Sequence, residues 1–332
     1  EAPVEGLDAE GVFRINTLQD GLDVTDFIAR EQPRNALIIG GGNIGLEMAE
    51  NLLLREMKVT LIEKEAEVMN ILDPDMAALV SQALLDMGVR LYRNEPLQSI
   101  DLRKNRVRAV VTNNRTIPTD LVILALGVTP NVHLAKTAGI ELGASGAIRV
   151  DDTMRTTAEN VWAGGDCVES FHLVSRRPTN IALGTVANKH GRVAGSNIGG
   201  EYAVFPGLVG TIVTKVGSTE IARTGLQEKE IQQTGKQYVT AVINSMTRAE
   251  YYPGSGPIAV KILAEKDSGR LLGGQIVGNA GAAKRIDVLA TALHTGLTLE
   301  EIADLDLSYA PPYSPLWDPV ALAARVTLKR LS

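Results

Sequence analysis

Three glycines and one carboxylate have the spacing of a dinucleotide-binding site. Gly40, Gly42 and Gly45 match the pattern G-x-G-x-x-G, and Glu63 ends the apolar segment that comes next in the chain. Gly40 permits a tight turn, Gly42 lets a pyrophosphate approach the backbone, and Gly45 allows a helix to pack closely on a strand. A carboxylate at Glu63 would bind the ribose hydroxyls of NAD and repel the 2′-phosphate of NADP. The pattern therefore predicts an NAD site that prefers NADH.

The segments around these residues supply the elements that such a site needs. Residues 36–39 are a short apolar run typical of a buried strand, and residues 58–62 are another. Between them, Ile44, Met48 and Leu52 lie on one face of a helix whose free N–H groups would meet the phosphates. Because strand, glycines, helix, strand and acid occur in this order, we favour a dinucleotide site over a tight turn that binds nothing.

Composition argues against several other classes of function. The chain has 332 residues, is 45% hydrophobic and carries a net charge of −6, so it is long enough for two or three domains. Aromatic residues make up only 4% and no basic block stands out, which argues against nucleic-acid binding. The longest apolar run, residues 121–126, is too short to cross a bilayer. The single cysteine suits a reducing compartment, and no histidine has metal-ligand spacing, so we expect a cytoplasmic protein without a metal.

The rest of the chain predicts further elements on either side of the glycines. A helix over 74–87, a hairpin over 106–117 and a buried strand over 121–127 complete one dinucleotide-binding unit. An apolar strand runs into Gly164-Gly165-Asp166, and a helix starts near Gly184. From about residue 205, an antiparallel α+β unit is expected. Its strands are predicted at 211–215, 220–223, 238–243, 258–263 and 271–277, and its helices at 282–294 and 299–304.

Taken together, four motifs resemble the flavin-dependent pyridine nucleotide-disulfide oxidoreductases. The most similar branch is that of the coenzyme A disulfide reductases, NADH oxidases and persulfide reductases. Residues 40–47 look like its NAD-binding stretch, and 125–131 look like its strand near the nicotinamide. Residues 161–166 look like its second flavin motif, and 309–319 look like its C-terminal signature. The resemblance implies hydride transfer from NADH to FAD, and then to coenzyme A disulfide, a persulfide or oxygen.

The same resemblance implies which residues bind the cofactors. Asp166 would bind the ribityl chain of FAD, residues 183–187 would lie near the flavin ring, and Glu47 would lie near the nicotinamide. The expected cofactor-binding residues are Gly40, Gly42, Asn43, Ile44, Gly45, Glu47, Glu63, Gly127, Gly165, Asp166, Gly184 and Thr185.

The implied fold class is α/β, with a Rossmann-like NAD-binding domain, part of a FAD-binding domain and a C-terminal α+β dimerisation domain. Residues 1–32 are expected to be a remnant of the FAD-binding domain and a linker, 33–127 the NAD-binding domain, 128–204 the second part of the FAD-binding domain and 205–332 the dimerisation domain of a homodimer. The first FAD-binding unit and the redox cysteine of the family have no counterpart in this sequence. We therefore expect weak FAD binding and incomplete catalysis from this chain alone. The alternative is a non-catalytic, NAD(H)-binding dimeric sensor or interaction module.

Two tyrosines and one basic pair leave alternatives open. Tyr309 either donates a proton or hydrogen bond at a partner subunit's flavin or packs in an interface loop, and Tyr251 either forms a second tyrosine site or belongs to a common turn. The pair Lys284-Arg285 either meets phosphates of coenzyme A or is a solvated basic face. Cys167 is expected to be buried beside Asp166 with a structural role.

Overall fold

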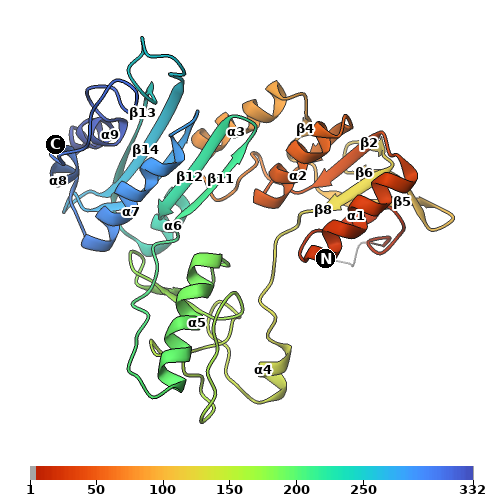
Figure 1. Ribbon diagram of the computed structural model, residues 1–332, viewed down its shortest axis with the longest axis horizontal. Coiled ribbons are helices and arrows are strands. Elements are labelled where there is room, and N and C mark those ends of the chain that lie inside the picture. Colours follow the sequence, from red (N-terminus) through yellow and green to blue (C-terminus); the bar gives the residue numbers. More distant parts are fainter. Residues whose placement is uncertain (1–4, 332) are drawn as a thin grey trace.

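The computed structural model describes residues 5–331, and its first unit is a parallel five-stranded sheet (Figure 1). Its elements are β1 (Val12–Arg14), β2 (Asn35–Ile39), α2 (Asn43–Leu54), β3 (Lys58–Ile62), α3 (Pro74–Asp86), β4 (Arg90–Tyr92) and β8 (Leu121–Leu124). The strand order is β1-β8-β2-β3-β4. The strands are short and apolar, and both faces of the sheet are covered, as in a sheet whose strands are joined by helical crossovers. The predicted strands and helices of this unit are thus confirmed, except that the strand predicted over 121–127 ends at Leu124.

A three-stranded antiparallel sheet lies between β4 and β8 in the chain. It consists of β5 (Leu97–Arg103), β6 (Arg106–Thr112) and β7 (Thr116–Pro118), in that order. Lys104 and Asn105 form its first turn with φ angles of 53° and 61°, the left-handed pair that a two-residue hairpin requires. A meander therefore takes the place of a helical crossover.

Strand β1 is part of the parallel sheet, and helix α1 (Leu18–Glu31) packs against it. Strand β1 pairs in parallel with β8, and helix α1 buries Val24 and Phe27 in the core beneath it. Thr17 and Asp20 form a capping box that starts this helix. The apolar side chains of α1 therefore pack against the parallel sheet. The assignment of residues 1–32 to a remnant of a FAD-binding domain and a linker stays a prediction.

The middle of the chain contains little regular structure. It holds α4 (His133–Thr137), the hairpin strands β9 (Ser170–His172) and β10 (Arg177–Thr179), and α5 (Gly184–Ile198). The strand predicted over 161–163 is wrong, because within the described residues this segment forms only an isolated bridge between Arg155 and Trp162. Two backbone hydrogen bonds flank this bridge, from Thr156 N to Val161 O and from Ala163 N to Met154 O, which is too short a pairing to form a strand.

The C-terminal unit is an antiparallel sheet in the order β11-β12-β15-β14-β13, with helices against one face (Figure 1). Its strands are β11 (Ile212–Val216), β12 (Thr219–Gly225), β13 (Tyr238–Met246), β14 (Pro257–Glu265) and β15 (Leu271–Gly278). Its helices are α6 (Glu228–Thr234), the 3₁₀ turn η1 (Ala283–Arg285), α7 (Ile286–Thr295), α8 (Leu299–Ala303) and α9 (Pro319–Leu328). Helices α6 and α9 are additions to the predicted elements. Asp318 caps α9 and Pro319 is its first residue, which is a recognisable helix start.

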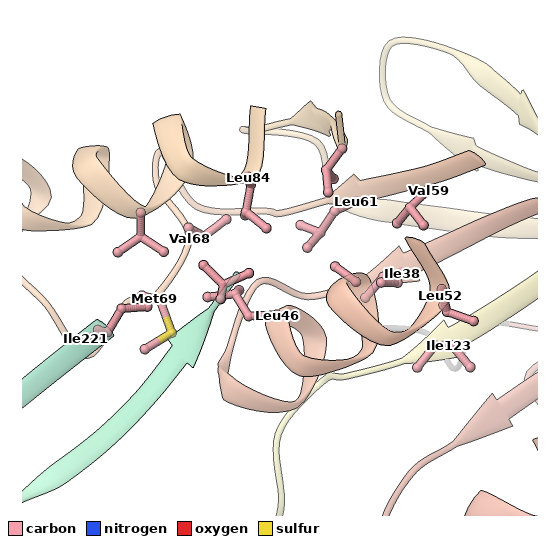
Figure 2. Packing of buried hydrophobic residues seen from close by; sticks show 14 of the residues in the cluster. Ile38, Leu46, Leu52, Val59, Leu61, Val68, Met69, Leu84, Ile123 and Ile221 are labelled. Carbon is pink, nitrogen blue, oxygen red and sulfur yellow. The ribbon is translucent and has the colours of Figure 1, made fainter. Parts of the chain in front are cut away.

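The parallel sheet and the C-terminal sheet share a hydrophobic core. Figure 2 shows Ile221 of β12 close to Met69, in the same cluster as Leu46 of α2 and Leu84 of α3. Burial of these apolar side chains contributes roughly 1.5–3 kcal/mol for each large residue. The two units therefore pack as one body along this face.

A group of charged and polar side chains around the buried Lys261 and Asp73, which we call the interface cluster, adjoins this core. It consists of Lys261, Asp73, Asp75, Glu228 and Gln275. The Nζ atom of Lys261 lies 2.8 Å from Asp75, 2.5 Å from Glu228 and 3.1 Å from Asp73. Gln275 Nε2 donates to Asp73 Oδ2 at 2.8 Å. The cluster thus connects the start of α3 to β14, β15 and α6 of the C-terminal unit.

No helix among the described residues is long and apolar enough to cross a membrane.

Candidate cofactor site and tyrosine loops

The glycine turn after β2 has the close backbone contacts that the sequence pattern predicts. Gly40 has φ +104°, and a Cβ atom there would lie 2.4 Å from the carbonyl oxygen of Ala125, just beyond β8. A Cβ atom on Gly45 would lie 2.0 Å from the carbonyl oxygen of Gly40. Both distances are far below van der Waals contact, so only glycine allows α2 to pack this closely on β2.

Gly42 differs from the other two glycines because the space beside it is open. It has φ −81° and caps α2, and a Cβ atom there would meet nothing within 4 Å. The first turn of α2 contains no acidic residue and receives no side-chain cap from Gly42, so its N–H groups face open space. The Asn43 Oδ1 atom is buried and has no hydrogen-bond partner among residues 5–331. A cradle of free donors with an unpartnered polar atom fits a pyrophosphate and its attached sugar.

Glu63 lies directly beside this turn and is only 9% exposed. Its Oε2 atom accepts a hydrogen bond from Gly41 N at 2.7 Å, and its Oε1 atom accepts one from Glu65 N at 3.0 Å. These two contacts fix the carboxylate at the carboxyl end of β3 while each oxygen keeps a free lone pair. A fixed negative charge at this position fits ribose hydroxyls and opposes a phosphate group.

The other predicted residues of the nucleotide site lie around the glycine turn with different exposures. Ile44 is half-buried in the first turn of α2. Glu47 is exposed one turn further along and accepts a hydrogen bond from Thr214 Oγ1 at 3.3 Å. It lines an open cavity of about 550 Å³ between α2 and β11, together with Glu50 and Lys215. Gly127 is exposed beyond the end of β8, with φ +87°.

A second set of predicted cofactor residues gathers at the start of α5. Gly165 has φ +89°, and a Cβ atom there would lie 3.7 Å from the Cβ of Ala187 in the first turn of this helix. Gly184 and Thr185, in the same turn, are exposed, as is Asp166. The N-terminal turn of α5 carries no acidic residue and no side-chain cap. An exposed carboxylate beside a helix start fits the polar chain and ring edge of a flavin.

His190 and Asn180 hold the turn that presents Asp166. Gly165 N donates to His190 Nδ1 at 3.2 Å, so the Nε2 atom carries the proton and donates to Ser170 Oγ at 3.3 Å. Burial lowers the pKa of His190, which keeps this ring neutral. Asn180 Nδ2 donates to the backbone oxygens of Asp166 and Val168. Sequence reasoning missed these supports, because a lone histidine and a lone asparagine carry no spacing signal.

Cys167 lies beside Asp166 but is half-exposed, and its Sγ atom is 3.7 Å from the carbonyl oxygen of Gly164. The expectation that the flavin motif buries this side chain is therefore met only in part. Asp166 is exposed, whereas Cys167 packs partly against the apolar cluster of Ala135, Ile148 and Val168. A structural role for Cys167 stays a prediction.

The two candidate tyrosines lie in loops of the C-terminal unit. Tyr309 is 49% exposed and Tyr251 is 78% exposed. Tyr309 lines a cavity of about 320 Å³ together with Trp317, whose ring is covered by the guanidinium of Arg325 at 3.7 Å.

Figure 1 shows residues 125–132 as an extended linker from the end of β8 toward α4. The glycine turn and the Asp166 turn therefore lie on different parts of the fold.

Comparison with known proteins gives consistent matches. The family model described as pyridine nucleotide-disulphide oxidoreductase matches residues 2–191, and the model of its dimerisation domain matches residues 211–319. An NADH oxidase of Methanocaldococcus jannaschii is 38% identical over 99% of this chain and 73% of its own length. A coenzyme A disulfide reductase of Staphylococcus haemolyticus is 28% identical over 93% of this chain and 69% of its own.

Among solved structures, an NAD-dependent persulfide reductase from A. fulgidus superposes with a TM-score of 0.96 at 42% identity. The match covers 99% of this chain but 61% of the other, so this chain spans less than two thirds of that protein. The relatives are named oxidoreductases, and the branch that the motifs predict is confirmed. The chain belongs to the pyridine nucleotide-disulphide oxidoreductase family, in the branch that includes coenzyme A disulfide reductases, NADH oxidases and persulfide reductases.

Proposed function

We propose that this chain supplies the NAD(P)H site of an FAD-dependent oxidoreductase that reduces a disulfide, a persulfide or oxygen. The observation that carries the proposal is the glycine turn, with its open space at Gly42 and the unpartnered Asn43 Oδ1. The names of its relatives support the same class of reaction. Bound FAD would accept a hydride and pass two electrons onward, and the protein would hold both cofactors in place.

Each predicted residue has a definite task in this proposal. The N–H groups at the start of α2 bind the pyrophosphate of the nucleotide, and Glu63 binds its ribose. Asp166, held by Asn180 and His190 through the backbone, binds the ribityl hydroxyls of the flavin. Tyr309 donates a hydrogen bond or proton to the thiolate or peroxide formed at the active site of a partner subunit, which gives the thiol or hydrogen peroxide.

We also propose a division of labour between segments. Residues 33–127 bind NADH, 128–204 hold part of the flavin, and 205–332 form a homodimer through an isologous contact. The match of residues 211–319 to a dimerisation-domain model supports the last assignment. Sedimentation that shows a stable monomer at micromolar concentration would contradict it.

The Gly42→Ala variant tests the nucleotide site. The added methyl group meets no protein atom within 4 Å, so we expect the free energy of unfolding to stay within about 1 kcal/mol of the wild-type value. The same methyl group occupies the space proposed for the pyrophosphate, and we expect NADH affinity to fall at least tenfold, which is about 1.4 kcal/mol. Calorimetric titration with NADH and urea unfolding measure the two effects.

Gly195→Ala on α5 is the matched control, because this glycine also has open space around it but lies outside the glycine turn. We expect the control to bind NADH as the wild type does. A Gly42→Ala variant that binds NADH with unchanged affinity would remove the basis of the proposed function.

Nucleotide preference is a separate expected result. Glu63 is fixed by two backbone N–H groups and cannot turn away from a 2′-phosphate. We therefore expect NADH to bind at least tenfold more tightly than NADPH, and Glu63→Gln to narrow this ratio by removing the charge. Titration of both proteins with both nucleotides measures it. Equal or tighter binding of NADPH to the wild type would show that Glu63 does not select the nucleotide.

A further inference from the structure

Two loops of the C-terminal unit carry its exposed tyrosines. The loop over residues 247–256 joins β13 to β14 and contains Tyr251, and the loop over residues 304–318 joins α8 to α9 and contains Tyr309. A backbone hydrogen bond from Ala249 N to Pro311 O, 3.2 Å long, places the loops side by side. We call them the tyrosine loops. Among residues 5–331, it is the only backbone hydrogen bond between the two loops. Side chains therefore provide the other contacts that hold the loops together.

One guanidinium group contacts both tyrosine loops. Arg285 Nη2 donates to Thr247 O at 2.6 Å in the first loop and to Tyr313 O at 2.8 Å in the second. Its Nη1 atom donates to Gly281 O at 2.6 Å, and its Nε atom pairs with Asp318 at 3.0 Å. Three nitrogens of one planar group thus reach four acceptors on three segments, which is the geometry that arginine provides and lysine does not.

The partner of this guanidinium is itself held in place. Asp318 Oδ1 accepts a hydrogen bond from Val320 N at the start of α9, and Asp318 Oδ2 accepts one from Ser314 Oγ. The side chains of Arg285 and Asp318 are only 11% and 14% exposed. In contrast, the neighbouring Lys284 is 82% exposed and pairs with Asp287 at the surface. Arg285 is thus part of neither a solvated basic face nor an open phosphate site, and the pair Lys284-Arg285 does not act as a unit.

We propose that Arg285 is a positioning residue that holds the two tyrosine loops in a single arrangement and thereby sets where Tyr309 stands. The proposal rests on the proposed function for the role of Tyr309, but the loop arrangement can be measured without it. A nearly buried arginine that bridges two backbone oxygens replaces the water that would otherwise solvate both loops. Removing the guanidinium group leaves its four acceptors without a shared donor, and the two loops then move independently.

Hydrogen–deuterium exchange of the unliganded chain tests the loop arrangement directly. Arg285→Met should speed exchange at least tenfold in peptides that cover both tyrosine loops, because Ala249 N, Tyr252 N and Tyr313 N are protected by hydrogen bonds within and between them. Arg285→Lys keeps the charge but not the fork, so we expect an intermediate effect. Lys284→Met, the matched control, should leave both loops at the wild-type rate.

Exchange in helix α7 separates positioning from general unfolding. We expect the exchange rates of residues 289–295, in the interior of α7, to stay unchanged in Arg285→Lys. This variant replaces Arg285→Met in the experiment if Arg285→Met does not fold. Unchanged loops, a change in one loop only, or equal acceleration of the loops and α7 would each overturn the proposal.

Turnover kinetics of the assembled, FAD-containing enzyme give the second test. Arg285→Lys should lower kcat at least threefold and leave the Kd for NADH unchanged. In the Tyr309→Phe background the same substitution should have little further effect, because both changes remove one function. A full, independent loss in the double variant would overturn the positioning role. If Tyr309→Phe itself keeps full activity, the proposed function of that tyrosine fails while the exchange experiment still decides the role of Arg285.

Discussion

Replacing Lys261 with methionine should lower the free energy of unfolding by about 3–5 kcal/mol, the cost typical of breaking a buried ion pair. The Lys261 side chain is 2% exposed, as is that of Asp73. Burial alone would lower the pKa of this lysine, but hydrogen bonds to Asp75 and Glu228 raise it, so it stays charged. Methionine fills a similar volume but leaves the carboxylates of the interface cluster facing one another without a cation. Urea unfolding at neutral pH measures the loss.

A second substitution shows whether the loss has this electrostatic origin. Burial raises the pKa of Asp73, and the attraction of Lys261 opposes that rise. Adding Asp73→Asn to Lys261→Met removes the buried charge but keeps an oxygen that accepts from Glu228 N, so we expect it to restore part of the lost stability. Lys236→Met, which breaks a partly exposed pair with Glu265, is the control and should cost less than about 1 kcal/mol. A Lys261→Met variant as stable as this control would contradict the prediction.

Acidification should also destabilise the protein by about 3 kcal/mol through His172. This ring is 4% exposed, and burial lowers its pKa to about 4 from 6.5. Its Nδ1 atom accepts hydrogen bonds from Val174 N and Ser175 N, which requires the neutral form. Below pH 6.5 the unfolded chain binds a proton that the folded chain does not, so this stability is present at neutral pH and decreases as the pH falls from 6.5 to 4.

The His172→Asn variant checks this assignment. The amide oxygen of asparagine can accept the same backbone hydrogen bonds but does not titrate, so the slope of unfolding free energy against pH should become shallower between pH 6.5 and 4. His133→Asn is the control, because His133 is exposed. Burial lowers the pKa of His190 as well, so part of the slope should remain. An unchanged slope in His172→Asn would assign the acid sensitivity to other groups.

Sequence predicts the nucleotide-binding unit well because its constraints are local. Gly40 has φ +104°, which favours glycine, Gly45 lies against the carbonyl oxygen of Gly40 five residues before it, and β2, α2 and β3 follow each other directly. The hairpin at Lys104-Asn105 is equally local, since two left-handed residues define it. In these segments the residue types alone carry the geometry.

Prediction from sequence fails where the geometry depends on distant segments. The apolar run at 161–163 has strand propensity, but no strand pairs with it among the described residues. His190 supports Gly165 from 25 residues away, and Arg285 reaches Asp318 across 33. No spacing rule relates such residues, because the contacts arise only after the units have packed. The interface cluster cannot be predicted from sequence either, because Lys261 and its partners at the start of α3 lie far apart in the chain.

The interface cluster also sets an order in which the chain can mature during synthesis. Lys261 follows Asp75 by 186 residues. At typical rates of translation, about 5–20 residues per second, about 10–40 s pass between the synthesis of Asp75 and that of Lys261. The parallel sheet can pair within residues 12–124 during that interval, while Asp73 and Asp75 remain hydrated. Docking of the C-terminal unit is therefore the step at which Asp73 loses water, and it can take place only after Lys261 has been synthesised.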